Sequence, residues 1–309
     1  MGIVVDQGSV YWTNGGDSNH IGSNAIMKVP ASGGSPTILV GGLEDPGPLI
    51  LDHGWFYWTD DIAGTVSKVP LTGGSPVVLA TGLVGPNVLA AFNGAIYWVN
   101  GGTVAARFQD GSVMTVSEGG GAPLVLASGQ QNAGAIAVDA TGVYWTNGGS
   151  YLWPNECCEG GIMKVPLAGG PVTALASMNG AAGLVLAGGR VYWVSNGPAA
   201  PDPANPPGVF SVSESGGPVA TLSLNGVNNA GFLTTDLTNL YWSNSGPPEA
   251  SQQWDQGSIV GMLLNGGPLT YYAKPAYQPY WIAFAASNIY WTEAGNFLWM
   301  PGRVLAAPK

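Results

Sequence analysis

Residues 135–147 read Ala-Ile-Ala-Val-Asp-Ala-Thr-Gly-Val-Tyr-Trp-Thr-Asn, and residues 162–176 read Ile-Met-Lys-Val-Pro-Leu-Ala-Gly-Gly-Pro-Val-Thr-Ala-Leu-Ala. Short runs of β-branched or aromatic residues that are bounded by Gly, Pro and Asn are typical of strands joined by tight turns. The two stretches therefore predict four consecutive strands, which we name A to D. They cover residues 135–139, 143–146, 162–166 and 172–176.

The same four-strand pattern recurs along the whole chain. Its second strand carries a Tyr-Trp pair, and the pairs begin at Tyr11, Tyr57, Tyr97, Tyr144, Tyr192, Tyr241 and Tyr290. The spacing of 40 to 49 residues is typical of propeller blades and other stacked units. A four-stranded sheet with two apolar faces cannot bury both faces alone, so we expect radial stacking. The prediction is an all-β, seven-bladed β-propeller with four antiparallel strands per blade, and six blades plus an irregular segment is the alternative.

The repeat also predicts the domain organisation, which is a single propeller domain over residues 1–309. In the last unit we expect strand A at 281–284, strand B at 289–292, strand C at 297–300 and strand D at 304–306. The last blade would then pack on the first without a strand shared between the termini. The expected blades cover residues 1–42, 43–82, 83–129, 130–177, 178–224, 225–272 and 273–309.

Composition limits the classes of partner. The chain has 309 residues, of which 8% are charged, and its formal net charge is −10. Such a surface repels phosphate groups, so we expect neither nucleic acid nor anionic membrane as a partner. No apolar run approaches the roughly 18 residues that a membrane span needs, which excludes insertion by a helix.

The first strand and the Tyr-Trp strand carry a resemblance to a known family. Tyr57-Trp58-Thr59-Asp60 resembles the YWTD repeat of receptor-type propellers, and Ile136–Asp139 resembles the first strand of YWTD and NHL-type repeats. The whole chain is similar to secreted bacterial repeat proteins that read VYWTN…KVP..GG.P..LA. The resemblance implies a propeller exported to the periplasm or the cell exterior, with its leader absent from this chain; a cytoplasmic protein is the alternative. Such propellers include adhesion modules, lectins, lyases and hydrolases.

Residues that recur in most units are expected to stabilise the repeat. They include the Asn or Asp that follows the Tyr-Trp strand and the carboxylates that close strand A, whose oxygens can accept N–H bonds of the next turn. Function is expected on the face that carries the B–C and D–A connections, because the B–C loops are long and irregular. The strand A carboxylates are Asp6, Asp52, Asp139 and Asp236.

Several residues outside the repeat are candidates for ligand contact on that face. Aromatic rings can stack on sugar rings or anchor a partner protein, and a nearby carboxylate supplies directional hydrogen bonds. The alternative is that these side chains only pack their own loops. The candidates are Tyr151, Trp153, Trp254, Asp255, Tyr277 and Tyr280.

The two cysteines, Cys157 and Cys158, are adjacent in the sequence. Adjacency prevents a bridge between distant strands of this chain. A disulfide between Cys157 and Cys158, two free thiols, bonds to another molecule and metal ligation remain as alternatives. Zinc normally takes four ligands at set spacings, and no CxxC or HxxxH partner is present.

Metal binding and catalysis have weaker support. We expect no cofactor, and calcium bound at the channel mouth is the alternative, because Asp60 and Asp61 offer oxygen ligands. The Asp-x-Asp-x-Asp-Gly loop that would indicate a calcium site more specifically is absent. The scaffold resembles that of lyase and lactonase-like propellers, some of which hold a central metal ion. Nucleophilic catalysis usually needs a histidine base. His20 and His53 are the only histidines, and we expect them on opposite faces.

We therefore favour a recognition module that binds a glycan or a protein partner through the B–C and D–A face. A metal-assisted lyase or hydrolase at the channel mouth is the first alternative. A structural subunit of a surface assembly is the second. The sequence leaves the oligomeric state open.

Overall fold

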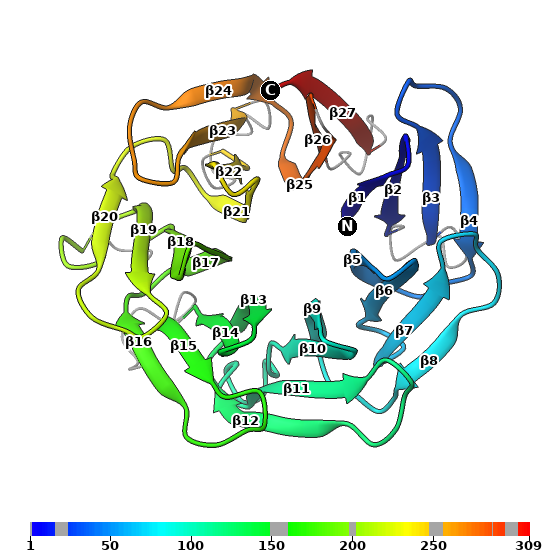
Figure 1. Cartoon of the computed structure of the whole chain (residues 1–309), viewed down its shortest axis with the longest axis horizontal. Helices are drawn as coiled ribbons and strands as arrows, with labels where there is room; N and C mark the ends of the chain where they lie inside the picture. The colour runs from blue at the N-terminus through cyan, green and yellow to red at the C-terminus, as the bar shows by residue number, and fades with distance from the viewer. Residues whose placement is uncertain are drawn as a thin grey trace.

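The computed structural model describes residues 2–15, 24–148, 160–197, 202–246, 256–285, 287–293 and 302–309. In this part of the chain, antiparallel strands form seven sheets that surround a central opening (Figure 1). Six sheets have four strands in the order A-B-C-D, and the sheet β25-β26-β27 has three. The predicted seven-bladed β-propeller is confirmed.

Strand A of each blade lies nearest the axis of the ring, and strand D lies at its circumference (Figure 1). The A strands are β1 (Ile3–Asp6), β5 (Pro46–Asp52), β9 (Pro86–Phe92), β13 (Ala133–Asp139), β17 (Ala181–Ala187), β21 (Ala230–Thr235) and β25 (Pro279–Ala285). The B strands carry the Tyr-Trp pairs and are β2 (Ser9–Asn14), β6 (Trp55–Asp60), β10 (Ala95–Asn100), β14 (Gly142–Asn147), β18 (Arg190–Ser195), β22 (Asn239–Asn244) and β26 (Asn288–Glu293).

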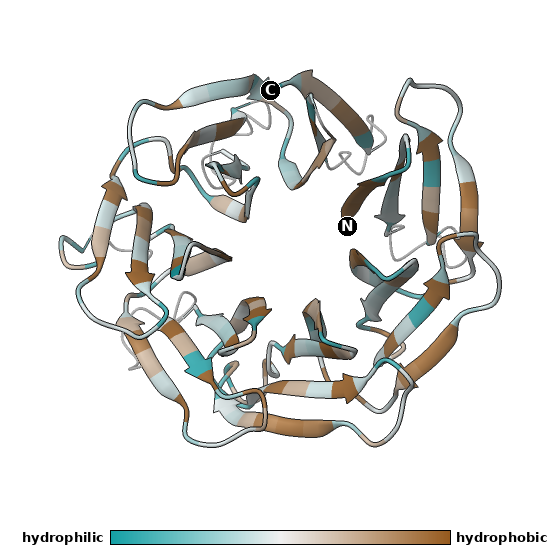
Figure 2. Cartoon of the chain, in the orientation of Figure 1, coloured by the Kyte–Doolittle hydropathy of each residue, from teal (hydrophilic) through white to brown (hydrophobic). Residues whose placement is uncertain are grey.

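The outer half of each blade is made by the C and D strands. The C strands are β3 (Ala25–Pro30), β7 (Thr65–Pro70), β11 (Gly111–Ser117), β15 (Gly161–Val165), β19 (Gly208–Ser213), β23 (Gly257–Leu263) and β27 (Arg303–Pro308). The D strands are β4 (Thr37–Gly41), β8 (Val77–Ala80), β12 (Leu124–Gln130), β16 (Thr173–Ser177), β20 (Ala220–Ser223) and β24 (Thr270–Ala276). Apolar residues run along β8 and β12 on the outside of the ring, where Val78 and Leu124 are largely exposed (Figure 2).

The last blade differs from the prediction. Residues 303–308 form β27, which pairs with β26 in the position of strand C, with Arg303 opposite Glu293 and Leu305 opposite Trp291. The prediction of strand D at 304–306 was wrong, and the predicted strand C at 297–300 lies outside the described residues. The reason is visible in the repeat: β3 and β7, both C strands, also end in proline, so the run that ends at Pro308 matches a third strand.

The A–B turns explain why the hairpins are so short. In blade 2, His53 and Gly54 have φ values of 45° and 79°, so both central residues of the turn are left-handed. Such a turn has the twist that two antiparallel strands need, and it places Asp52 directly opposite Trp55. The strand A carboxylates thus lie beside the turn, as expected; the N–H groups of Thr141 and Gly142 both donate to Asp139 Oδ1.

The core consists of layers between neighbouring blades rather than one central cluster. Between blades 3 and 4, for example, Val113 and Leu126 pack with Trp145 and Val165. Six of the seven Tyr-Trp tryptophans are at most 5% exposed. Because each layer joins two adjacent blades, every sheet depends on its neighbours for burial of both faces.

Among the described residues, no helix has the length and apolar character that a membrane span requires.

Candidate functional site

A cavity of about 720 Å³ opens at the centre of the ring. Its wall is built from the first residues of strand A in blades 2 to 7, from the residue just before that strand in blades 2 to 4, and from B–C loop residues such as Asp61 and Phe108. D–A and B–C connections therefore share one face, as the alternation of strand direction predicted. The rigid A strands converge here (Figure 1), so side chains that are far apart in sequence line one site.

The wall of the cavity is mostly glycine, proline and aliphatic residues, with a small polar set. Two carboxylates, Asp45 and Asp61, contribute from blade 2, and two amides, Asn87 and Asn132, contribute from blades 3 and 4. No lysine, arginine or histidine is among the described residues that line the cavity. The site therefore presents negative charge and hydrogen-bonding groups on an apolar wall, which is the usual composition of a small-molecule site.

Asp60 and Asp61 are adjacent but have different environments. Asp60 is buried, and its carboxylate accepts hydrogen bonds from the backbone N–H groups of Glu44, Asp45 and Ala63. Asp61 is exposed and lines the cavity. Asp60 thus fixes the loop, while Asp61 is the member of the pair that lines the cavity. Their assignment to a metal ion stays a prediction.

The pKa of Asp61 is raised. Although the residue as a whole is exposed, the surrounding protein removes part of the water from its carboxyl group, which is the main cause of the raised pKa; the neighbouring carboxylates of Asp45 and Asp60 add to it, because a second negative charge disfavours ionisation. A cation, or a ligand that donates hydrogen bonds, would relieve this repulsion.

Of the two predicted aromatic residues in the described part of the chain, Tyr280 lines the cavity, and its side chain is 49% exposed. Trp281 is beside it in the wall, and its ring centroid is 4.1 Å from that of Phe232. Tyr277 is not among the lining residues. Its backbone N–H donates to Glu293 Oε1, and its hydroxyl is buried.

The other predicted ligand residues, Tyr151, Trp153, Trp254 and Asp255, lie outside the described residues, as do Cys157 and Cys158. The cavity residues that sequence reasoning missed are Asp45, Asn87, Asn132 and Trp281. The signal for them was positional, since each lies at or just before the start of an A strand, where the D–A connections reach the channel.

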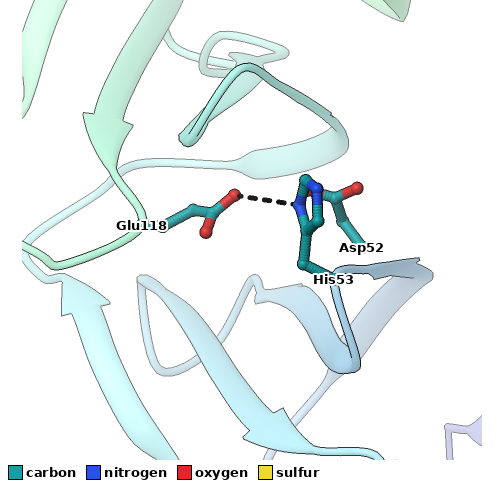
Figure 3. Close-up of side chains that lie close together, drawn as sticks. All are labelled: Asp52, His53 and Glu118. Atoms are coloured by element: carbon teal, nitrogen blue, oxygen red, sulfur yellow. Dashed lines mark hydrogen bonds and ion pairs between the residues drawn. The ribbon is translucent and has the colours of Figure 1, made fainter.

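A second group of titratable residues lies on the opposite face (Figure 3). His53 Nδ1 is 2.8 Å from Asp52 Oδ2 and 3.9 Å from Glu118 Oε1. Among the residues that the structure describes, this is the one cluster of three His, Cys or carboxylate ligands close enough to hold a metal ion. Burial raises the pKa of Tyr57 to about 12, and the negative charges of Glu118 and Asp52 add to this increase.

The carboxylate pair in this second cluster is part of the repeat. Asp52 ends strand A of blade 2 and Glu118 follows strand C of blade 3, and Asp139 and Glu214 have the same relation in blades 4 and 5. In each case a C-strand lysine bonds the glutamate's backbone carbonyl: Lys68 donates to Glu118 O and Lys164 to Glu214 O. Only the histidine is particular to blade 2, and its side chain is 74% exposed. The arrangement is therefore a scaffold contact, beside which His53 places a third side chain of a type that can bind a metal ion.

Comparison with known proteins supports the fold alone. No family model matches the sequence, and no curated protein matches it. Among solved structures, the chain is similar to a catalytically inactive virginiamycin B lyase from Staphylococcus aureus with quinupristin, with a TM-score of 0.68, 13% identity, and coverage of 100% of this chain and 94% of that one.

Two other structures have related folds. An oligogalacturonate lyase in complex with manganese has a TM-score of 0.66 and 12% identity, over 97% of this chain and 86% of that one. A nidogen/laminin complex gives a TM-score of 0.51 and 20% identity, over 70% of this chain and 76% of that one. The fold thus occurs both in lyases and in a protein that forms a protein complex. At these identities, function has to be argued from the site.

Proposed function

We propose that this propeller is a recognition module of the periplasm or the cell exterior, and that it binds a glycan at the mouth of its central channel. The observation that carries the proposal is the cavity of about 720 Å³ to which six blades contribute. A site on converging A strands is held in place by the whole ring, so its shape is fixed before a ligand arrives.

The chemistry of the wall favours a sugar over an anionic or purely apolar ligand. Tyr280 presents an exposed ring, and sugars stack on such rings through their C–H faces. Asp45, Asp61 and Asn87 supply acceptors and a donor for hydroxyl groups. The absence of basic side chains from the described wall argues against phosphate or carboxylate ligands. A protein partner that inserts a polar loop is the alternative within the same class.

The test is a glycan array, followed by titration of the best-bound oligosaccharide while tryptophan fluorescence is recorded. Tyr280→Ala is expected to weaken binding about tenfold, because a lost stacking contact is worth roughly 1–1.5 kcal/mol. Tyr271→Ala is the matched control: Tyr271 is 45% exposed on β24, away from the channel. Equal loss in both variants, or no bound glycan on the array, would contradict the proposal.

A metal-assisted lyase or hydrolase at the same site is the second candidate. Asp61 and Asp45 favour it, since both line the cavity, the Asp61 backbone N–H donates to the Asp45 carbonyl, and carboxylate oxygens suit a divalent cation. Native mass spectrometry with and without a chelator separates the two candidates. One tightly held ion per chain that Asp61→Asn removes would favour the enzyme. A metal-free chain that still binds the oligosaccharide would favour recognition.

A further inference from the structure

The layer between blade 7 and blade 1 differs from the other six layers. Among the residues that the structure describes, its buried apolar core consists of Ile3, Val10 and Tyr290, and further apolar residues are partly covered. Blade 7 is also the one described sheet with three strands, so β27 is its outermost described strand. An outermost strand presents N–H and C=O groups that have no strand partner on that side.

The closed layers show what a fourth strand does. In four of these closed layers, a leucine of strand D lies against a glycine in the C–D turn of the next blade. A methyl group added at Gly73 would lie 3.0 Å from Leu39 Cδ1, and one added at Gly169 would lie 3.7 Å from Leu126 Cδ2. The same contact joins Leu79 with Gly120 and Leu175 with Gly216.

Blade 1 has the same turn, but nothing described lies over it. Gly33 has φ 91°, close to the 84° of Gly73, yet a methyl group added at Gly33 would meet no described atom within 4 Å. The place that a D-strand leucine takes in the other layers is open. It belongs to a groove of about 430 Å³ between blades 7 and 1.

The walls of the groove fit an apolar strand. They include Val10, Trp12, Val29 and Gly33 of blade 1 and Val304–Ala306 of β27. Trp12 is only partly buried, whereas the other six Tyr-Trp tryptophans are at most 5% exposed. The one charged lining residue, Arg303, is already paired with Glu293 at 2.7 Å. The groove thus offers an apolar surface and a strand edge rather than a site for a charged ligand.

We propose that this groove, at the outer edge of β27, binds an extended strand supplied by a partner polypeptide. The strand would pair with β27 through its backbone and place a leucine over Gly33. The D strands β8, β12 and β16 each contain the sequence Leu-Ala, and their leucine takes the equivalent place over the turn glycine of the next blade. The closed layers of the ring serve as the template for this occupant. The proposal is independent of the glycan site, because the groove and the channel cavity have no lining residue in common.

The chain contains its own probe for this site. A labelled synthetic peptide of residues 171–177, Pro-Val-Thr-Ala-Leu-Ala-Ser, carries the D strand of blade 4. Fluorescence anisotropy is expected to show saturable binding of this peptide to the intact protein. A peptide with the L175D change is expected to bind at least tenfold more weakly, because aspartate would bury a charge over Gly33. Equal binding of both peptides, or no binding at about 1 mM peptide, would overturn the proposal.

Two further measurements locate the bound peptide. Ala31→Trp fills the groove and is expected to reduce affinity at least tenfold, while Ser32→Trp, one residue along and outside the lining, leaves it unchanged. Hydrogen exchange of the unaltered protein is expected to slow in residues 302–309 when peptide is added, which tests the site without any substitution. Peptide binding without this protection would place the peptide elsewhere and refute the site. A dimer that forms without peptide and is abolished by Ala31→Trp would assign the groove to a second copy and refute the partner strand.

Discussion

The layer between blades 3 and 4 and the layer between blades 7 and 1 contain the same sequence pattern in different surroundings. Trp145 pairs with Ile136 across the A–B hairpin, and Trp12 pairs with Ile3 in the same register. Trp145 is fully buried, and its Nε1 donates to Gln130 Oε1 at the end of β12 in the preceding blade. Trp12 has no described D strand before it and is only partly buried. The repeat therefore sets where a tryptophan lies, while the outer strand of the neighbouring blade decides how deeply it is buried.

The largest effect should come from truncating the two tryptophans. Trp145→Ala is expected to lower the free energy of unfolding by about 3–5 kcal/mol, since it empties a closed layer. Trp12→Ala should cost about half of that or less, because less of its surface leaves water on folding. Urea unfolding followed by circular dichroism measures both. Equal losses would mean that the layer between blades 7 and 1 is as well packed as the others.

A second comparison tests the leucine over the turn glycine. Leu175→Ala is expected to destabilise the protein by about 2–3 kcal/mol, because Leu175 is 8% exposed and sits between blades 4 and 5. Ile38→Ala is the control, since Ile38 is also on a D strand but is 67% exposed. It should change stability by less than about 0.5 kcal/mol. Similar losses for the two would show that the outer strands do not act through this contact.

The other side of blade 7 is held to blade 6 by an ion pair, which gives a pH prediction. Burial alone would raise the pKa of Asp236, but hydrogen bonds from the Asn239 backbone, Lys309 and Tyr241 outweigh it and lower that pKa to about 2. Lys309 Nζ is 3.0 Å from Asp236 Oδ2, and the side chain of Asp236 is 19% exposed. A lowered carboxyl pKa stabilises the fold above the unfolded value of about 4 and loses that contribution as pH falls toward 2.

Asp236→Asn is therefore expected to cost about 2 kcal/mol at pH 7 and progressively less between pH 4 and pH 2. Urea unfolding of the variant and the unaltered protein across this range gives the difference. A cost that does not change with pH would show that the ionised carboxylate is not what joins the two blades.

The smallest effect is expected on the face opposite the channel. His53→Ala should change the free energy of unfolding by less than about 0.5 kcal/mol in metal-free buffer, because the histidine side chain is 74% exposed. The control is Ala140→His, which places a histidine beside the equivalent Asp139–Glu214 pair. If added Zn²⁺ stabilises the unaltered protein but not His53→Ala, His53 completes a metal site. If Zn²⁺ has no effect on either, the cluster is a scaffold contact only.

Much of the fold was predictable because the information is local and repeated. The strands predicted for blade 4 agree with the structure to within about two residues, since Gly-bearing turns and alternating apolar residues fix each hairpin independently. The last blade was misjudged because the apolar run 297–300 and the run that ends at Pro308 both have strand composition. Only pairing with β26 shows that the second run is strand C.

The site was less predictable, because its residues meet through the ring rather than along the chain. Sequence position correctly placed the D–A and B–C connections on one face, and Tyr280 and Asp61 line the cavity on that face. Asn87 and Trp281 were missed because their residue types do not mark them, and their only signal is a position near the start of an A strand. Glu118 was missed because it reaches His53 from the next blade, 65 residues away. Contacts of this kind depend on how one sheet is rotated against its neighbour, which no single repeat specifies.

By itself, the sequence determined the number of blades, the strands of most blades and the face on which the irregular loops lie. These features follow from short-range backbone preferences and from the need of each sheet to bury two faces. Only the tertiary structure decided which residues meet at the channel, that Asp60 supports the loop while Asp61 lines the cavity, and that the layer between blades 7 and 1 has an open groove. The physical reason is that burial and electrostatics are set by neighbours in space, and in a ring those neighbours come from different repeats.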